Sequence, residues 1–90
     1  MQIRFFEIDE TEAFLLGFPL KLTPTERRIL LTIAQSGNAS TDDLIRLLSS
    51  GVTRENITVH ISSINKKAHA ISGRKLILFG NKQYKINEHM

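Results

Sequence analysis

The stretch that decides the fold runs from Thr53 to Gly73 and reads TRENITVHISSINKKAHAISG. Its apolar residues recur at intervals of three and four positions, which is the period of one face of an α-helix. This apolar stripe consists of Ile57, Ile61, Ile64 and Ala68. Thr53 can cap the first turn and Gly73 can end the last one, so we expect a helix over residues 54–71. The opposite side of that helix carries Thr58, Ser62, Asn65, Lys66 and His69.

Two runs of strand-forming residues follow this helix. They are Leu76-Ile77-Leu78-Phe79 and Gln83-Tyr84-Lys85-Ile86, and the residues between them are Gly80-Asn81-Lys82. Strand formers on both sides of a short turn that contains Gly and Asn are typical of a β-hairpin. The sequence therefore predicts a hairpin over residues 76–86.

Two shorter helices precede the long one. Thr23 is followed by Pro24 and, three residues on, by Glu26, which makes a capping box with proline at the first helical position. Ser40 and Asp43 make a second capping box. We expect helices over 24–36 and 41–49, the second ended by Ser49-Ser50-Gly51. The predicted core residues of the three helices are Ile29, Leu30, Ile33, Leu44, Leu48, Ile57, Ile61 and Ile64.

The first 22 residues contain three runs that favour strands, separated by polar or glycine breaks. The runs are Gln2–Ile8, Ala13–Leu16 and Phe18–Leu22. They indicate an antiparallel meander, which is stable only against a partner surface. We expect the five phenylalanines of the chain to lie in the core or in these and the later strands.

Strands, three helices and a hairpin, in this order, indicate an α+β fold of the winged helix-turn-helix class. We expect residues 1–90 to form one such domain, with strands in 1–22, helices in 23–72 and the hairpin, or wing, in 74–87. The helix over 54–71 would then enter the major groove of DNA, which admits one helix. The wing would lie on the DNA backbone or in the minor groove.

The charge of the chain is divided unevenly. Residues 1–50 hold five basic and seven acidic residues, a net charge of −2, whereas residues 51–90 hold seven basic and two acidic residues, a net charge of +5. A basic half in a small domain points to a polyanionic partner, most often nucleic acid. A basic face that serves only solubility is the alternative that charge alone leaves open.

Several classes of function lack support in the sequence. The chain has no cysteine, which excludes a disulfide framework and a thiol nucleophile. Its three histidines show no spacing typical of metal ligands, and no pair of nucleophile and base stands out, so we expect no enzyme, no metal and no cofactor. No apolar run reaches 18 residues and no signal peptide is visible. We therefore expect a cytoplasmic protein without a membrane partner.

Three segments resemble the output domains of OmpR/PhoB-type response regulators. Leu22-Thr23-Pro24-Thr25-Glu26 is similar to the Leu-Thr-Pro-x-Glu signature that opens the first helix of that family. Ile57-Thr58-Val59-His60-Ile61-Ser62 resembles the start of the family's recognition helix, and Tyr84-Lys85-Ile86 resembles the end of its wing. The family also carries a four-stranded sheet before the first helix, so the resemblance covers nearly the whole chain.

The resemblance implies a bacterial transcription-regulatory domain of a two-component system that binds double-stranded DNA. It also implies, as further partners, RNA polymerase or a second copy in head-to-tail arrangement. The sequence departs from the family where arginines are usual, at Glu55, Ser63 and Asn65 and in the wing segment Gly80-Asn81-Lys82-Gln83-Tyr84.

The candidate DNA-binding residues lie on the long helix and in the hairpin. We expect Thr58, Ser62 and Asn65 to face base edges, and Lys66, Lys67 and Lys82 to contact phosphates. The full set of candidates is Arg54, Thr58, Ser62, Ser63, Asn65, Lys66, Lys67 and Lys82. Because the family's arginines are missing, a winged helix used for protein–protein contact, with little or no DNA binding, is the alternative interpretation.

Overall fold

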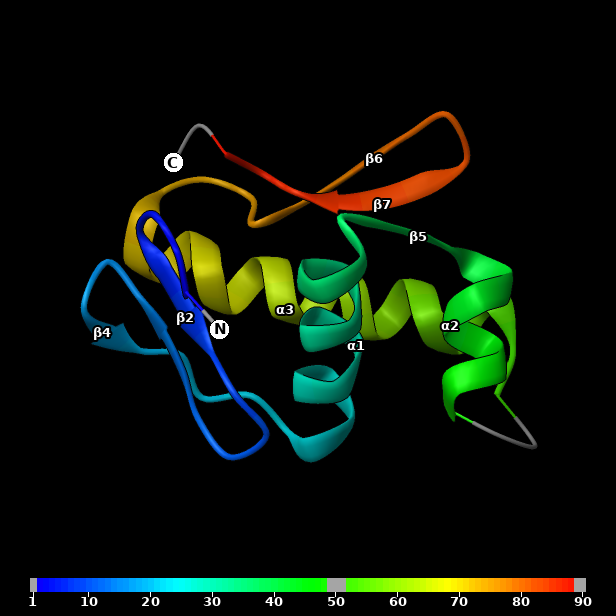
Figure 1. The fold of residues 1–90 in the computed structure, drawn as a ribbon, viewed down its shortest axis with the longest axis horizontal. Helices are drawn as coiled ribbons and strands as arrows, with labels where there is room; N and C mark the ends of the chain where they lie inside the picture. The colour runs from blue at the N-terminus through cyan, green and yellow to red at the C-terminus, as the bar shows by residue number, and fades with distance from the viewer. Residues whose placement is uncertain (1, 49–51, 89–90) are drawn as a thin grey trace.

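The computed structural model describes residues 2–48 and 52–88, with the strands, helices and hairpin in the predicted order (Figure 1). The N-terminal strands are β1 (Gln2–Ile3), β2 (Phe6–Ile8), β3 (Ala13–Leu15) and β4 (Phe18–Pro19). The middle of the chain forms α1 (Pro24–Ser36), β5 (Asn38–Ser40), α2 (Thr41–Leu48) and α3 (Arg54–Ser72). The hairpin consists of β6 (Ile77–Gly80) and β7 (Gln83–Ile86). The predicted turn at Ser49-Ser50-Gly51 lies outside the described residues.

The N-terminal strands form an antiparallel sheet in the order β1-β2-β3-β4, which is the four-stranded sheet that the resemblance implies. The prediction of one strand over residues 2–8 is wrong. The chain reverses at Arg4, which has a φ of 42°, so that Ile3 pairs with Phe6. Phe5 and Phe6 are neighbours and would point to opposite faces of a straight strand. In the structure Phe6 lies in the core, where it is 1% exposed, and Phe5, within the reversal, is half-buried against the same core.

Each helix begins at the cap that the sequence predicts. The backbone N–H of Glu26 donates to the hydroxyl of Thr23 over 3.2 Å, and the N–H of Thr23 donates to the Glu26 carboxylate over 2.9 Å. Ser40 and Asp43 exchange the same pair of hydrogen bonds, each 3.1 Å long, at the start of α2. Such reciprocal bonds satisfy backbone donors that the first helical turn leaves unpaired.

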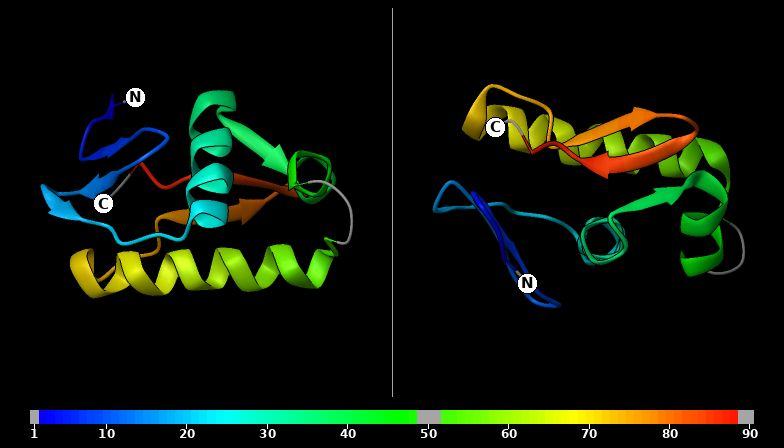
Figure 2. Two further views of the ribbon diagram at one scale, coloured as in Figure 1. Left: turned by 90° about the horizontal axis from the view of Figure 1, so that it is seen from below. Right: turned by 45° about the horizontal axis from the view of Figure 1, so that its top comes forward.

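A second, three-stranded antiparallel sheet has the order β5-β7-β6. The strand β5 was not predicted, because its residues lie between the two predicted helices and Ser40 was assigned only to the cap of the second. In the structure Asn38 pairs with Lys85 and Ser40 pairs with Gln83. Because β5 lies between α1 and α2, its pairing with β7 holds the hairpin against this part of the protein (Figure 2).

The hairpin reverses through two residues, Asn81 and Lys82, rather than the predicted three. Both have positive φ angles, 53° and 62°, as a type I′ turn requires. Gly80 belongs to β6 and pairs with Gln83. The turn type matters for the site because it places the lysine at the tip of the wing.

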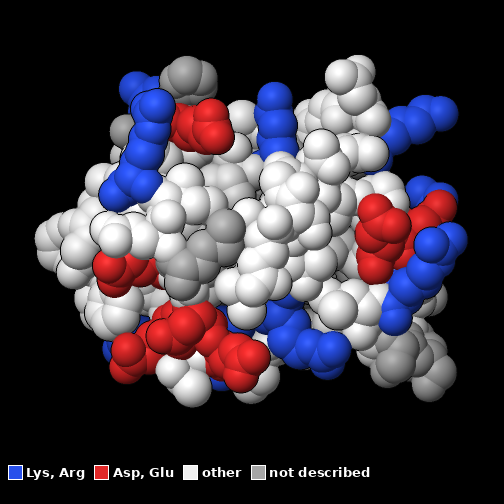
Figure 3. All heavy atoms as spheres, viewed as in Figure 1, with Lys and Arg blue, Asp and Glu red and all other residues white. Residues whose placement is uncertain are grey.

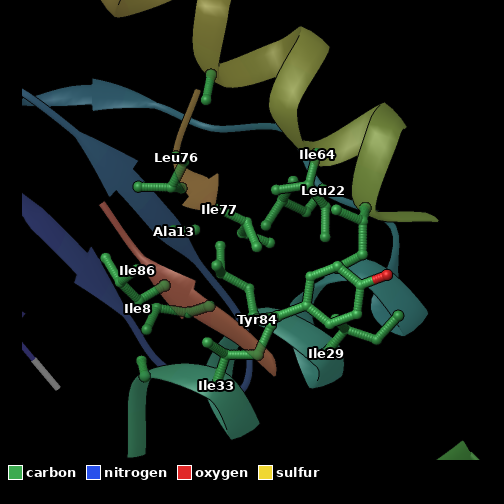
Figure 4. Packing of buried hydrophobic residues seen from close by; sticks show 14 of the residues in the cluster. Ile8, Ala13, Leu22, Ile29, Ile33, Ile64, Leu76, Ile77, Tyr84 and Ile86 are labelled. Atoms are coloured by element: carbon green, nitrogen blue, oxygen red, sulfur yellow. The ribbon is translucent and has the colours of Figure 1, made fainter. Parts of the chain in front are cut away.

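One cluster of buried side chains connects both sheets and the helices (Figure 4). The helix α1 lies between the two sheets and crosses α3 steeply (Figure 2). Residues from all these elements meet in the cluster; among them are Ile8, Ile33, Ile64, Ile77, Tyr84 and Ile86. The predicted core is confirmed except for Leu48, which is half-buried at the edge of the cluster because it ends α2.

Candidate nucleic-acid interface

The helix α3 has the two faces that its sequence predicts. Its stripe of Ile57, Ile61, Ile64 and Ala68 is buried. Thr58, Ser62 and Lys66 are exposed on the side that faces away from the core. Short polar side chains on an exposed helix face allow the helix backbone to approach another surface closely.

The start of α3 is fixed by a capping box and an ion pair. The N–H of Asn56 donates to the Thr53 hydroxyl over 3.3 Å, and the N–H of Thr53 donates to the Asn56 side-chain oxygen over 3.0 Å. The guanidinium of Arg54 contacts the Asp42 carboxylate of α2 over 3.2 Å, with both side chains mostly exposed. An exposed pair of this kind contributes little to stability. Arg54 therefore remains accessible to an external phosphate.

A groove of about 740 Å³ runs between α3 and the hairpin. Thr58 and Ser62 line its helical side, and Lys75, Phe79 and Lys85 line its hairpin side. The groove thus brings together three predicted site residues, Thr58, Ser62 and Asn65, with Lys75, Phe79 and Lys85, which were not among the predicted site residues.

Asn65 also lines this groove, but its amide is hydrogen-bonded to the hairpin. Its side-chain N–H donates to the carbonyl of Ile77 over 3.0 Å, and the N–H of Ile77 donates to its side-chain oxygen over 2.8 Å. Base reading by Asn65 stays a prediction, and it would require the amide to release Ile77. Both polar groups that would recognise an adenine are engaged within the fold.

Lys67 and Ser63 are also committed inward, to Glu26 at the start of α1. The ammonium group of Lys67 lies 2.6 Å from the Glu26 carboxylate, which is only 4% exposed. Burial by itself raises the pKa of Glu26, but hydrogen bonds from Lys67, Ser63 and the Thr23 backbone outweigh it, so the pKa lies below its ordinary value. In this structure the charge of Lys67 balances a buried carboxylate, and its contact with phosphate stays a prediction. Ser63 is engaged in the same cluster.

The hairpin carries exposed positive charge. Lys82 stands at the tip, and Lys75 and Lys85 are exposed beside the groove. Figure 3 shows basic side chains along the upper edge of the molecule, where the hairpin lies, and a cluster of carboxylates at the lower left, over the N-terminal sheet. A cation at a hairpin tip can reach a phosphate that a helix in the adjacent groove does not.

Phe79 is the residue whose environment the sequence analysis predicted least well. It lies in a strand, as expected, but its side chain is 60% exposed in the groove. The apolar run Leu76–Phe79 gives no sign of this exposure. The signal available was its position near the tip of the hairpin, where only Gly80 separates it from the turn.

Strands, three helices and a basic hairpin, with a polar helix face beside the hairpin, define a winged helix-turn-helix protein. Among solved structures, the chain is similar to the DNA-binding domain of the response regulator AdeR, solved in complex with an intercistronic region. The two share 20% sequence identity at a TM-score of 0.78, over 97% of this chain and 98% of that one. The fold that the resemblance to OmpR/PhoB-type output domains implies is thereby confirmed. No family model and no curated protein matches the sequence.

Proposed function

We propose that this chain is the DNA-binding domain of a transcriptional regulator, with α3 in the major groove and the hairpin on the backbone or in the minor groove. One observation carries the proposal: the exposed polar face of α3 borders a groove whose other side is a lysine-bearing hairpin. In this geometry a helix and a wing can contact neighbouring grooves of one duplex. The similar AdeR domain was solved in complex with an intercistronic region, which supports DNA binding as the function.

The residues that remain available divide into two kinds of contact. In this proposal Thr58 and Ser62 contact base edges, and Arg54, Lys66 and Lys82 contact phosphates; all five side chains are exposed. Ser and Thr hydroxyls can bond to more than one kind of base. Affinity therefore comes mainly from phosphate contacts, which carry no sequence information directly. We infer a domain with modest sequence preference and strong dependence on salt.

Two finer inferences follow from the resemblance and belong to the same proposal. The chain acts as the output domain of a two-component regulator in the bacterial cytoplasm, and it binds direct repeats as head-to-tail copies or contacts RNA polymerase. The sedimentation of the protein on a duplex with one and with two copies of a selected site tests the head-to-tail arrangement.

Fluorescence anisotropy with labelled double-stranded genomic fragments at two salt concentrations tests DNA binding directly. The decisive variant is Ser62→Glu, which places a negative charge on the exposed face of α3. Gln2→Glu adds the same charge on the exposed surface of the N-terminal sheet and is the matched control. We expect Ser62→Glu to weaken binding at least tenfold and Gln2→Glu to leave it nearly unchanged.

The alternative function, a protein–protein interaction module, is favoured by one observation. Three of the four site residues from Ser63 to Lys67 are engaged within the fold, namely Ser63, Asn65 and Lys67. Lys66 is then the one cation of this segment that stays available to a DNA phosphate. Under that alternative the wild-type protein would not bind the fragments even at low salt. This result would refute the proposed DNA-binding function.

A further inference from the structure

Phe79 presents a large apolar ring at the centre of the candidate interface, a position where the contacts proposed above use only polar and charged groups. Its side chain is 60% exposed. It lines the groove beside α3, and it also lines a second recess of about 470 Å³ between α2 and the tip of the hairpin. The ring thus forms a ridge between two hollows. Burying such a ring against a flat apolar partner removes its surface from water, which is favourable.

The ring is held in place from behind. Phe79 pairs with Tyr84 across the hairpin, and their ring centroids lie 4.7 Å apart with the planes inclined by 52°. Tyr84 is itself buried in the core, where it is 8% exposed. An aromatic contact with a fixed partner limits the rotation of the Phe79 ring. The open part of the ring therefore needs little ordering when it binds a ligand.

The surroundings of the ring favour a negatively charged partner. Lys75 and Lys85 line the same groove, and Lys82 lies at the nearby tip. Among the described residues that line the groove none is acidic; the second recess includes Asp42, which is paired with Arg54. An aromatic ring among cations is the arrangement by which proteins bind unstacked nucleobases, since the ring meets the base and the cations meet the phosphates.

We propose that Phe79 is a stacking platform for a single nucleobase, so that this domain binds best to DNA whose base stack is opened beside the wing. The proposal rests on the DNA-binding function proposed above and specifies its substrate. In an intact duplex both faces of each base are covered by neighbouring bases. An apolar ring can reach a base face only where the stack is parted, as at a kinked step or an unpaired base.

The preferred DNA then follows from the cost of opening the stack. Pyrimidine–purine steps open easily, and a bulged base is already unpaired. The domain should therefore bind a duplex with one bulged adenine more tightly than the same duplex without the bulge. The loss of a stacking side chain weakens binding to the exposed base by roughly tenfold.

The experiment measures dissociation constants for two labelled duplexes that differ only in one bulged adenine. The variants are Phe79→Ala, Phe79→Leu and Phe79→Tyr, and Phe18→Ala is the matched control because Phe18 is 62% exposed on the N-terminal sheet. In a parallel measurement 2-aminopurine replaces the bulged adenine, and its fluorescence falls when the base stacks. Circular dichroism of each variant establishes that it is folded.

We expect the wild type, Phe79→Tyr and Phe18→Ala to prefer the bulged duplex by about tenfold and to quench 2-aminopurine. Phe79→Ala and Phe79→Leu should lose both the preference and the quenching while they retain affinity for the intact duplex. If Phe79→Ala weakens binding to both duplexes equally, Phe79 contacts a groove edge of intact DNA and the stacking proposal is overturned. Equal wild-type affinity for both duplexes overturns it as well and leaves the DNA-binding function standing. If the wild type binds neither duplex, both proposals fail.

Discussion

The side-chain amide of Asn65 in α3 bonds to both backbone polar groups of Ile77 in β6. It donates to the Ile77 carbonyl over 3.0 Å and accepts from the Ile77 N–H over 2.8 Å. The amide thus pairs with the hairpin as a neighbouring strand would, at the point where β6 begins. Ile77 is buried beneath this contact. This side chain therefore links the wing directly to α3, in addition to the pairing of β7 with β5 and the shared core.

The variant Asn65→Ala tests this coupling. It leaves the N–H and the carbonyl of Ile77 without their partner, and each unsatisfied buried group costs about 1–3 kcal/mol. We expect a lower free energy of unfolding in urea and faster hydrogen exchange of the Ile77 amide. Asn65→Asp keeps the acceptor for the Ile77 N–H but loses the donor, and it should fall between the wild type and Asn65→Ala. Unchanged exchange at Ile77 in Asn65→Ala would contradict the coupling.

The neighbouring lysines of α3 should separate into a DNA-binding residue and a structural one. Lys66 is exposed, so Lys66→Gln should lower DNA affinity and reduce the slope of log affinity against log salt by about 0.9. Lys67→Gln leaves the buried Glu26 carboxylate without its cation, so it should destabilise the fold by more than the ~1 kcal/mol typical of an exposed pair. Urea unfolding and salt titrations of both variants provide the comparison. A salt slope that changes more for Lys67→Gln than for Lys66→Gln would reverse these roles.

The pH dependence of stability should report the Glu26 cluster. The pKa of Glu26 is lowered in the folded protein from an ordinary value of 4.5. A lowered pKa in the folded state contributes stability that is present above the unfolded value and is lost as the pH falls through the folded value. We therefore expect the free energy of unfolding to be steady near neutrality and to decrease below about pH 4.5.

Glu26→Gln isolates this contribution, because it removes the titrating group and keeps a similar shape. The pKa values of Asp9 and Asp43 are lowered too, by hydrogen bonds from Thr11 and Ser40 respectively, so part of the pH dependence remains in the variant. The measurement is urea unfolding at several pH values between about 3 and 7. An acid dependence as steep in Glu26→Gln as in the wild type would show that the cluster does not contribute.

Ile61 tests the assignment of α3 to the core. Ile61 belongs to the buried stripe of α3 and also lines the groove, and its side chain is only 7% exposed. Ile61→Ala should destabilise the protein by about 2–5 kcal/mol, and Ile61→Val should cost about 0.5–1.5 kcal/mol. Thermal and urea unfolding measure both. A loss below 0.5 kcal/mol for Ile61→Ala would be inconsistent with a packed site.

Lys82 tests the wing. Its φ of 62° disfavours alanine, so Lys82→Asn is the better substitution, since asparagine tolerates this conformation and carries no charge. We expect weaker binding to all sequences alike and a salt slope reduced by about 1. Lys21→Asn, on the segment before α1, is the control with the same change of charge. Equal slopes for the wild type and Lys82→Asn would limit Lys82 to solvating the turn.

Local signals were sufficient to predict the helices. The caps at Thr23, Ser40 and Thr53 and the apolar stripe of α3 depend on residues within a few positions of each other, and each is present in the structure. The strand β5 could not be predicted in this way. Its three residues become a strand only because β7, more than 40 positions further on, pairs with them.

The candidate site was predicted less completely for a similar reason. Asn65 and Lys67 have suitable chemistry for DNA, and the helical period places Asn65 on the side opposite the apolar stripe. Their actual partners, Ile77 and Glu26, are 12 and 41 residues away. Helical period therefore separates buried from exposed positions, but it does not show whether a half-buried polar residue will turn inward.

The separation of charge between the two ends of the chain gives the molecule a permanent electric dipole. The N-terminal strands and their turns hold Glu7, Asp9, Glu10 and Glu12 against Arg4 and Lys21, while the hairpin region holds Arg74, Lys75, Lys82 and Lys85 against Glu88. The electric field of a polyanion such as a DNA duplex exerts a torque on this dipole, and the torque turns the hairpin toward the polyanion before contact. The N-terminal sheet then faces outward, so a protein that docks on that sheet would meet the bound domain from the solvent side. This orientation weakens as salt shortens the range of the field.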